Sequence, residues 1–327
     1  MKLLSLLKQA SLAMLASTCM LASTAQAQAP APAQPPLTIA YITNGNTNEG
    51  WTLINNGAER AGQAAGVRLI KVAAERGELS RQLAIVEDMI SRRVSAIAIA
   101  PVDSAGIAPA INRALAAGIP VIAVDTGITG ARITSYVATD NVRAGVVQGR
   151  WTGEQVRDGD TVIYITGDQS QSTGRERRSG FLQGLNEVRR NVRVVEVSTT
   201  WDQTMAQNGV EAALRSHRNA RVIAAAWDGG ALGARAAMLS AGLRPGSIQI
   251  VGFDGSPGGL MMMRQGWMQA NVAQMLSRIG QVGVETAIAA ARGQTVPERI
   301  DTGSFLVLPA NLEQFARDSG VIQFMRP

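Results

Sequence analysis

Short apolar, β-branched runs alternate along the chain with amphipathic segments of helical period. The first series of runs covers residues 37–43, 67–73, 95–101 and 120–124. A second series covers residues 161–166, 192–197, 221–226 and 248–252 in the same rhythm. Such alternation is typical of βαβ units, so each series predicts a parallel sheet covered by helices.

The two series predict two similar, Rossmann-like α/β halves, with residues 134–141 as the crossing between them. The C-terminal part does not continue the second series. It predicts a short strand at 270–274, a helix at 278–291 and a further strand at 300–308, enough chain to pass between the halves twice more. The length of 327 residues agrees with two domains of ordinary size.

The N-terminus has the pattern of an exported protein. Two lysines precede a small-residue, apolar stretch at 10–22, and Ala25–Ala27 provides small residues where a leader peptidase reads them. We predict a signal peptide at residues 1–27 and a flexible Ala/Pro/Gln lead-in at 28–36. A membrane anchor or a lipid attached to Cys19 are the alternatives, which the broken apolar stretch and the preceding residue disfavour.

Composition narrows the function classes. With 46% hydrophobic and 17% charged residues, the chain is typical of a folded globular protein. One Cys and one His exclude a disulfide framework, a Cys/His metal centre and Cys/His nucleophilic catalysis, so no metal or cofactor is expected. Without the leader, 29 basic and 25 acidic residues remain, lacking the aromatic clustering of a nucleic-acid surface. We therefore expect a soluble periplasmic protein that binds no nucleic acid.

Candidate ligand contacts follow the predicted strands, because ligands of open parallel sheets bind beyond the carboxyl ends of the strands. These positions hold acids, amides, an arginine and indole rings, which suit the hydroxyls and the C–H face of a sugar. They are Asn44, Asn48 and Trp51 after the first strand, Asp125 and Thr126 after the fourth, Arg175 after the fifth, Trp201 after the sixth, Trp227 after the seventh and Asp254 after the eighth.

Each candidate has a structural alternative. Asn48 can cap the following helix, and Trp51 heads an apolar stripe that can belong to the core. Asp125 and Asp254 can be turn residues, and Arg175 lies in a charged run typical of a solvated helix face.

The sequence disfavours an enzyme. Asp125 and Asp254 have no companion His or Cys, and no phosphate-loop signature occurs. Asp228, which precedes two glycines, is predicted to cap a helix and not to contact a ligand.

Several short motifs occur in a fixed order, each modest alone: 38–40 with Asn48 downstream, 122–125, 139–141, 174–177 leading to 180–181, 231–234, 251–255 and 273–274. In this order they make residues 37–308 resemble the exported type I periplasmic binding proteins for sugars, and among these the ribose-binding members. The resemblance implies two domains joined by three hinge strands, at 37–139 plus 274–301 and at 140–273 plus 302–327. It also implies a monomer that encloses a monosaccharide or polyol and delivers it to the membrane permease of an ABC importer.

The resemblance also implies roles for individual residues. Asp125, Arg175, Asp254 and Gln274 match residues that hydrogen-bond sugar hydroxyls, Asn44 and Asn48 match polar contacts of the first loop, and Trp51 and Trp201 match rings against the sugar. Three positions depart from the family pattern: Thr126 replaces an arginine, Trp227 replaces an asparagine and Gly50 replaces an aromatic residue. We therefore expect a reshaped pocket, with ring contact from Trp227, whose ligand differs from ribose.

Two other functions stay open. The same fold serves ligand-carrying sensors for chemotaxis or signalling, whereas a repressor on this fold needs a DNA-binding domain where this chain has its predicted leader. An exported enzyme acting on a sugar, with Asp125 and Asp254 as acid and base, is the second alternative.

Overall fold

The apolar runs form two sheets of six strands each within residues 37–45 and 48–325, which are the residues that the computed structural model of the chain describes. The predicted signal peptide and lead-in lie outside these residues. The α/β prediction is confirmed, since helices separate most of the strands and cover both sheets. In the described part of the chain, no helix has the length and apolar character needed to cross a membrane.

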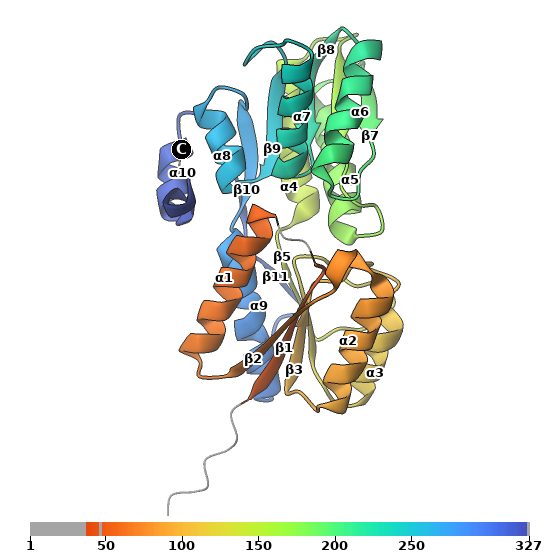
Figure 1. Cartoon of the computed structure of the whole chain (residues 1–327), viewed down its shortest axis with the longest axis vertical. Coiled ribbons are helices and arrows are strands. Elements are labelled where there is room, and N and C mark those ends of the chain that lie inside the picture. Colours follow the sequence, from red (N-terminus) through yellow and green to blue (C-terminus); the bar gives the residue numbers. More distant parts are fainter. Residues whose placement is uncertain (1–36, 46–47, 326–327) are drawn as a thin grey trace, which may run out of the picture. The chain divides into compact units, whose positions relative to one another are not determined.

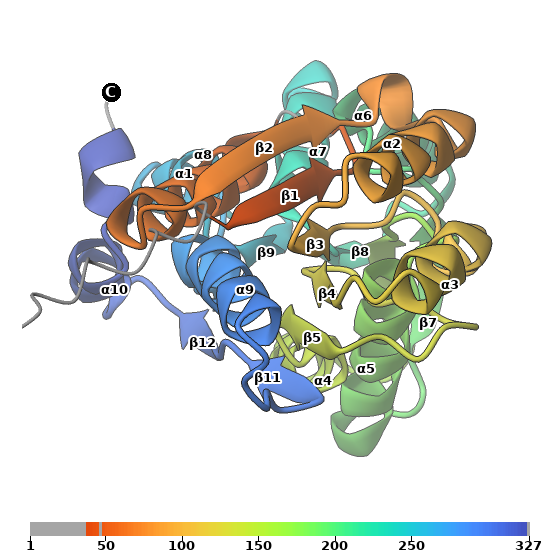
Figure 2. The ribbon, with the colours of Figure 1, turned by 90° about the horizontal axis from the view of Figure 1, so that it is seen from below.

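The first sheet is entirely parallel, in the order β2-β1-β3-β4-β5-β11. Figure 2 shows this order, with α1 and α9 on one face and α2 and α3 on the other. The strands are β1 (Thr38–Thr43), β2 (Arg68–Ala73), β3 (Ala96–Ile99), β4 (Val121–Val124), β5 (Ser135–Ala138) and β11 (Arg299–Asp301). The helices are α1 (Glu49–Ala64), η1 (Glu75–Gly77), α2 (Leu79–Ser91), α3 (Ala108–Ala116) and α9 (Leu276–Ala291).

The second sheet has the order β7-β6-β8-β9-β10-β12 and is parallel except for β12, which pairs antiparallel with β10. In Figure 1, α6 and α7 lie in front of its strands. The strands are β6 (Thr161–Ile165), β7 (Arg193–Val197), β8 (Ala220–Ala225), β9 (Gln249–Asp254), β10 (Ala270–Gln274) and β12 (Ser304–Val307). The helices are α4 (Asn141–Gln155), α5 (Ser172–Val188), α6 (Gln203–Ser216), α7 (Asp228–Ser240), α8 (Pro257–Arg264), α10 (Leu312–Asp318) and η2 (Val321–Phe324).

The chain passes between the sheets after β5, after β10 and after β11. The prediction of one strand at 300–308 is wrong, because two strands in different sheets occupy this segment. Gly303, at φ 89°, turns the chain between them, and its N–H donates to Asp301 Oδ1 at 2.9 Å. The division into domains at 139, 273 and 301 stays a prediction, since the residues from 36 onward form one compact unit.

Close helix packing holds α9 against α1. A Cβ at Gly57 of α1 would overlap the carbonyl oxygen of Ser277, and a Cβ at Gly280 of α9 would overlap that of Ile54. Glycine at both positions therefore lets the two backbones touch. Because α1 and α9 start close to the ends of β1 and β10, this contact also fixes where their first turns lie.

Two glycines of α1 provide a matched test of this packing. We expect Gly57→Ala to lower the free energy of unfolding by roughly 1–3 kcal/mol, because its methyl group must displace the α9 backbone. At Gly62 a Cβ would lie 3.4 Å from Leu69 Cβ, an ordinary contact. Gly62→Ala should therefore be neutral or stabilising by up to about 1 kcal/mol through helix propensity. Denaturant unfolding of both variants measures the difference, and equal effects would contradict the packing argument.

Candidate functional site

A pocket lies where the loops at the carboxyl ends of both sheets meet. It has an empty volume of about 410 Å³, including the part open to solvent. Eight of the ten predicted contact residues line it: Asn44, Asn48, Trp51, Asp125, Trp201, Trp227, Asp254 and Gln274. Six further residues line it that the sequence did not single out as contacts: Gly50, Ile54, Gln171, Thr173, Arg177 and Leu276.

Three residues of the pocket have a strained backbone with positive φ. Asp125, Trp201 and Asp254 have φ angles of 64°, 63° and 107°, and within the described residues only Arg93 joins them as a non-glycine residue with positive φ. Such conformations cost on the order of 1–3 kcal/mol each and persist only where surrounding contacts determine them. At Asp125, the backbone carbonyl accepts from Tyr136 OH at 3.0 Å and the N–H donates to Val137 O at 2.9 Å.

Arg177 is the guanidinium of the pocket, and it is only 4% exposed. Its Nε donates to Asn141 Oδ1 at 2.9 Å and its Nη1 to the carbonyl oxygen of Ala226 at 2.7 Å. Nη1 also lies 3.3 Å from Asp254 Oδ1, and the guanidinium carbon lies 4.0 Å from the ring centroid of Phe253. This one cation therefore ties the start of α4, the end of β8 and the end of β9 together.

The structure does not bring Arg175 to the pocket, which corrects the prediction for this residue. Arg175 is exposed and donates to the carbonyl oxygen of Gln169 at 2.8 Å. Helix α5 begins at Ser172, so Thr173 and Arg177, four residues apart, share its pocket face, whereas Arg175 lies on the opposite side. This four-residue spacing at the start of the helix is the signal that could have found Arg177.

Thr126 also lies outside the pocket lining, contrary to its predicted contact with ligand. It is fully buried and its hydroxyl donates to Asp125 Oδ2 at 2.9 Å. The hydroxyl therefore orients the carboxylate of Asp125 and is not itself presented to a ligand.

Three side chains of the pocket offer hydrogen-bond acceptors: Asp125, Asp254 and Gln274. Burial raises the pKa of both Asp125 and Asp254, and the charge of Arg177 counteracts this for each. Gln274 Nε2 donates to Asp254 Oδ1 at 2.8 Å, while Gln274 Oε1 is buried without a partner among the described residues. A ligand that donates hydrogen bonds would satisfy this oxygen.

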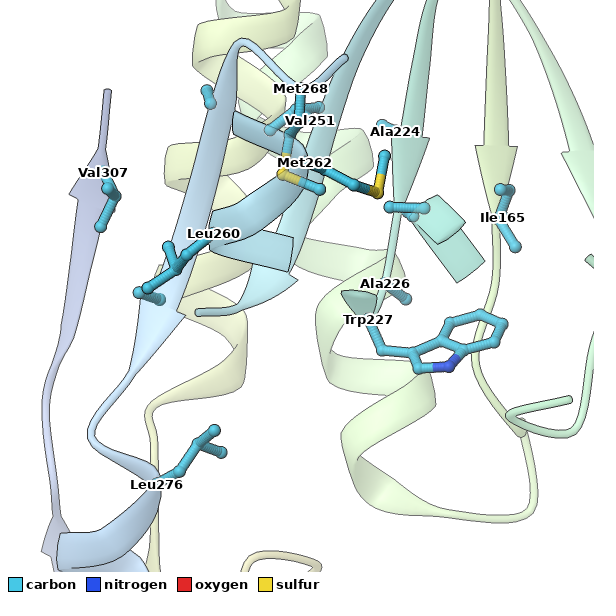
Figure 3. Close-up of a cluster of buried hydrophobic side chains, with 14 of the residues drawn as sticks. Ile165, Ala224, Ala226, Trp227, Val251, Leu260, Met262, Met268, Leu276 and Val307 are labelled. Carbon is cyan, nitrogen blue, oxygen red and sulfur yellow. The ribbon is translucent and has the colours of Figure 1, made fainter. Parts of the chain in front are cut away.

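Two indole rings form one wall. The rings of Trp201 and Trp227 meet edge to face, with centroids 5.3 Å apart at 88°. A Cβ at Gly167 would overlap the ring of Trp201, whose Nε1 donates to Gln171 Oε1 at 2.8 Å. Figure 3 shows the Trp227 indole reaching from the end of β8 toward the end of the strand that carries Ile165. The predicted ring contact from Trp227 therefore has a rigid support at the pocket.

Two residues at the start of α1, Asn48 and Trp51, have a structural role and also line the pocket. Asn48 is the N-cap of α1, since its Oδ1 accepts from the N–H of Trp51 at 3.1 Å, and it lines the pocket as well. Trp51 is buried in the core and also borders the pocket. The structural roles weighed from the sequence therefore hold for both residues, while their contact with a ligand stays a prediction.

The prediction that Asp228 caps α7 is wrong, because the N-cap residue is Trp227 and Asp228 is the first residue of the helix. Its side chain is turned into the protein, where it accepts from Ser256 N at 2.8 Å and from Asn271 Nδ2 at 2.6 Å. Within residues 37–45 and 48–325, no group of three or more His, Cys, Asp or Glu side chains is arranged to hold a metal ion.

Two mostly parallel sheets whose strand ends meet at one polar, ring-lined pocket define a two-lobed α/β ligand-binding protein. A family model described as periplasmic binding protein domain matches residues 39–295. The chain therefore belongs to the periplasmic binding protein family, which confirms the resemblance drawn from its motifs.

Known relatives agree with this assignment. The ribose import binding protein RbsB of Escherichia coli (strain K12) is 30% identical over 271 residues, covering 83% of this chain and 90% of that protein. An ABC transporter periplasmic solute binding protein from Actinobacillus succinogenes 130z, solved with bound D-allose, has a TM-score of 0.79 at 27% identity, covering 85% and 99%. A protein from Mycobacterium smegmatis in complex with β-D-fucofuranose has a TM-score of 0.81 at 26% identity, covering 88% and 97%.

The site predicts how stability depends on pH. We expect the free energy of unfolding of the ligand-free protein to fall as the pH rises from about 4 to about 8. Burial raises the pKa of Asp125, Asp228 and Asp254, so in this interval the folded state binds more protons than the unfolded state. Denaturant unfolding at constant ionic strength measures the slope. Asp254→Asn removes one of these groups and should make the slope shallower, whereas identical slopes would contradict this origin.

Proposed function

We propose that the protein captures a neutral monosaccharide or polyol between its two lobes and delivers it to the membrane permease of an ABC importer. The observation that carries the proposal is the combination of two desolvated carboxylates, one arginine and three indole rings in one pocket. Carboxylates accept from sugar hydroxyls, while indole faces suit the apolar C–H face of a sugar ring. The relatives described above are named for binding ribose or were solved with bound sugars.

The balance of donors and acceptors favours a neutral ligand rich in hydroxyl groups. Arg177 already uses Nε and Nη1 on protein groups, whereas Asp125, Asp254 and Gln274 offer acceptors to the pocket. Two carboxylates against one guanidinium disfavour an acidic or phosphorylated sugar, whose charge would lie beside uncompensated acids.

Direct bonds between the lobes support a mechanism of closure around the ligand. On one side, Ser104 N donates to Ser170 O at 3.2 Å, Ser172 N to Ser104 Oγ at 2.8 Å, and Gly127 N to Ser172 Oγ at 2.8 Å. On the other side, Gly258 N donates to Glu49 Oε2 at 2.6 Å. We propose that ligand contacts made by both lobes at once shift an open-to-closed equilibrium, and that the importer binds the closed form.

The departures from the family pattern favour a ligand other than ribose. The Thr126 hydroxyl donates to Asp125, so the pocket lacks the hydrogen-bond donor that an arginine provides at this position in the family. Trp227 adds a ring and Gly50 leaves space, so the apolar contact moves toward the second sheet.

Export and transport complete the proposal. We propose that residues 1–27 direct the chain to the periplasm, where it acts as a monomeric binder without catalysis.

A ligand-carrying sensor for chemotaxis is the second candidate, because a chemoreceptor can bind the same closed form. Product analysis after incubation with sugars tests for an enzyme, and turnover would overturn the proposal.

A thermal-shift screen followed by calorimetry tests the ligand class. We expect one or more neutral pentoses, hexoses, deoxy sugars or polyols to bind and to raise stability, by about 2.7 kcal/mol at one hundred times Kd. Sugar acids and sugar phosphates should not bind. A screen in which only the anionic sugars bind would contradict the proposal.

A pair of variants tests the site. Asp254→Asn should weaken binding of the sugar selected by the screen at least about tenfold, because a charge-assisted hydrogen bond is lost. Arg175→Ala is the matched control, and we expect it to leave Kd unchanged because this side chain is exposed outside the pocket. Equal losses in both variants would contradict the geometry described here.

A further inference from the structure

We infer that Asp228 and Asn271 are positioning residues that hold the turn after β9, so that Asp254 presents its carboxylate to the ligand. The inference rests on the proposed function of the pocket and adds two residues that do not line it. We call the turn of residues 254–256 the Asp254 turn.

Three hydrogen bonds connect this pair to the Asp254 turn. Asp228 accepts from Ser256 N through Oδ2 at 2.8 Å and from Asn271 Nδ2 through Oδ1 at 2.6 Å. Asn271 Oδ1 accepts from Gly255 N at 2.9 Å. The two N–H groups that follow Asp254 in the chain are therefore both bound by this pair.

The pair is enclosed by the protein. Asp228 is 1% exposed and Asn271 is fully buried. A Cβ at Gly252 would lie 2.5 Å from Asp228 Oδ1, and a Cβ at Gly259 would overlap the Asp228 carboxyl group. The backbones of β9 and of the start of α8 thus leave room for this carboxyl group and for little else.

The Asp254 turn requires such support. Asp254 has φ 107° and Gly255 has φ 69°, so two consecutive residues lie in the left-handed region. A non-glycine residue holds this conformation only where its neighbours determine it. On the other side, Gln274 and Arg177 contact Asp254 Oδ1, so the carboxylate direction depends on both its own contacts and the anchored turn behind it.

Exchange of the two side chains provides a sharp test. In Asp228→Asn, an amide replaces a carboxyl group that faces two donors, so one donor loses its acceptor. In Asn271→Asp, two carboxyl groups face each other and the amide donor to Asp228 Oδ1 is lost. The double variant restores all three hydrogen bonds, because Asn at 228 can accept from Ser256 N and donate to Asp at 271, which still accepts from Gly255 N.

Two measurements follow these variants. Amide hydrogen exchange of the ligand-free protein reports the anchoring of Gly255 and Ser256. Calorimetry with D-ribose, D-allose and D-fucose reports binding. We expect both single variants to increase exchange at these two amides and to weaken sugar binding about tenfold or more, and the double variant to restore both to within about threefold of the wild type. Asp158→Asn, an exposed position, is the control and should change neither.

The outcomes separate this inference from the proposed function. If exchange follows the expected pattern but the wild type binds none of these three sugars, the three sugars are excluded as ligands and the anchoring of the turn stands. Unchanged exchange in the single variants, or a folded double variant that recovers neither property, would overturn the inference. Should the single variants fail to fold, the double variant decides alone, since loss of exchange protection or of affinity in it contradicts the pairing.

Discussion

The site depends on one buried guanidinium whose charge acts on two carboxylates. Arg177 counteracts the pKa increase that burial imposes on Asp125 and Asp254, and it does so from a helix of the second lobe. Asp125 follows β4 of the first lobe and Asp254 is the last residue of β9 in the second. The cation therefore stabilises acids from both sheets in one pocket, and a neutral ligand adds hydrogen bonds there without adding charge.

A second constraint is the strained backbone at the ends of β4 and β9 and near the end of the loop before α6. These turns are held from behind by buried groups: Tyr136 and Thr126 at Asp125, Gly167 and Gln171 at Trp201. The strain is thus compensated by contacts within the protein itself, and these contacts orient the side chains that border the pocket.

The sequence predicted the strands and most of the pocket because two strong patterns carry this information. Apolar runs define buried parallel strands, and the ligand positions follow them directly in the chain. The sequence predicts Arg175 where the structure has Arg177 in the pocket. Which helix residues face the pocket depends on the first residue of the helix, and the sequence leaves that residue uncertain by one or two positions. The prediction of one strand at 300–308 is wrong because Ile300 and the apolar run 305–308 lie on either side of Gly303, where the chain changes sheets.

The differences at Gly50 and Trp227 act together, as their positions in the pocket explain. A side chain at Gly50 would begin 3.3 Å from Asn48 Oδ1 and 3.9 Å from Asp254 Oδ2, directly over the acid. Glycine there leaves the Asp254 carboxylate accessible from the first lobe. Trp227 meanwhile packs edge to face on Trp201 and extends the apolar wall of the second lobe. On the side of α1 the pocket therefore offers the Asp254 carboxylate for polar contact, and on the side of β8 it offers indole rings. A ligand must match this asymmetry between a polar and an apolar side.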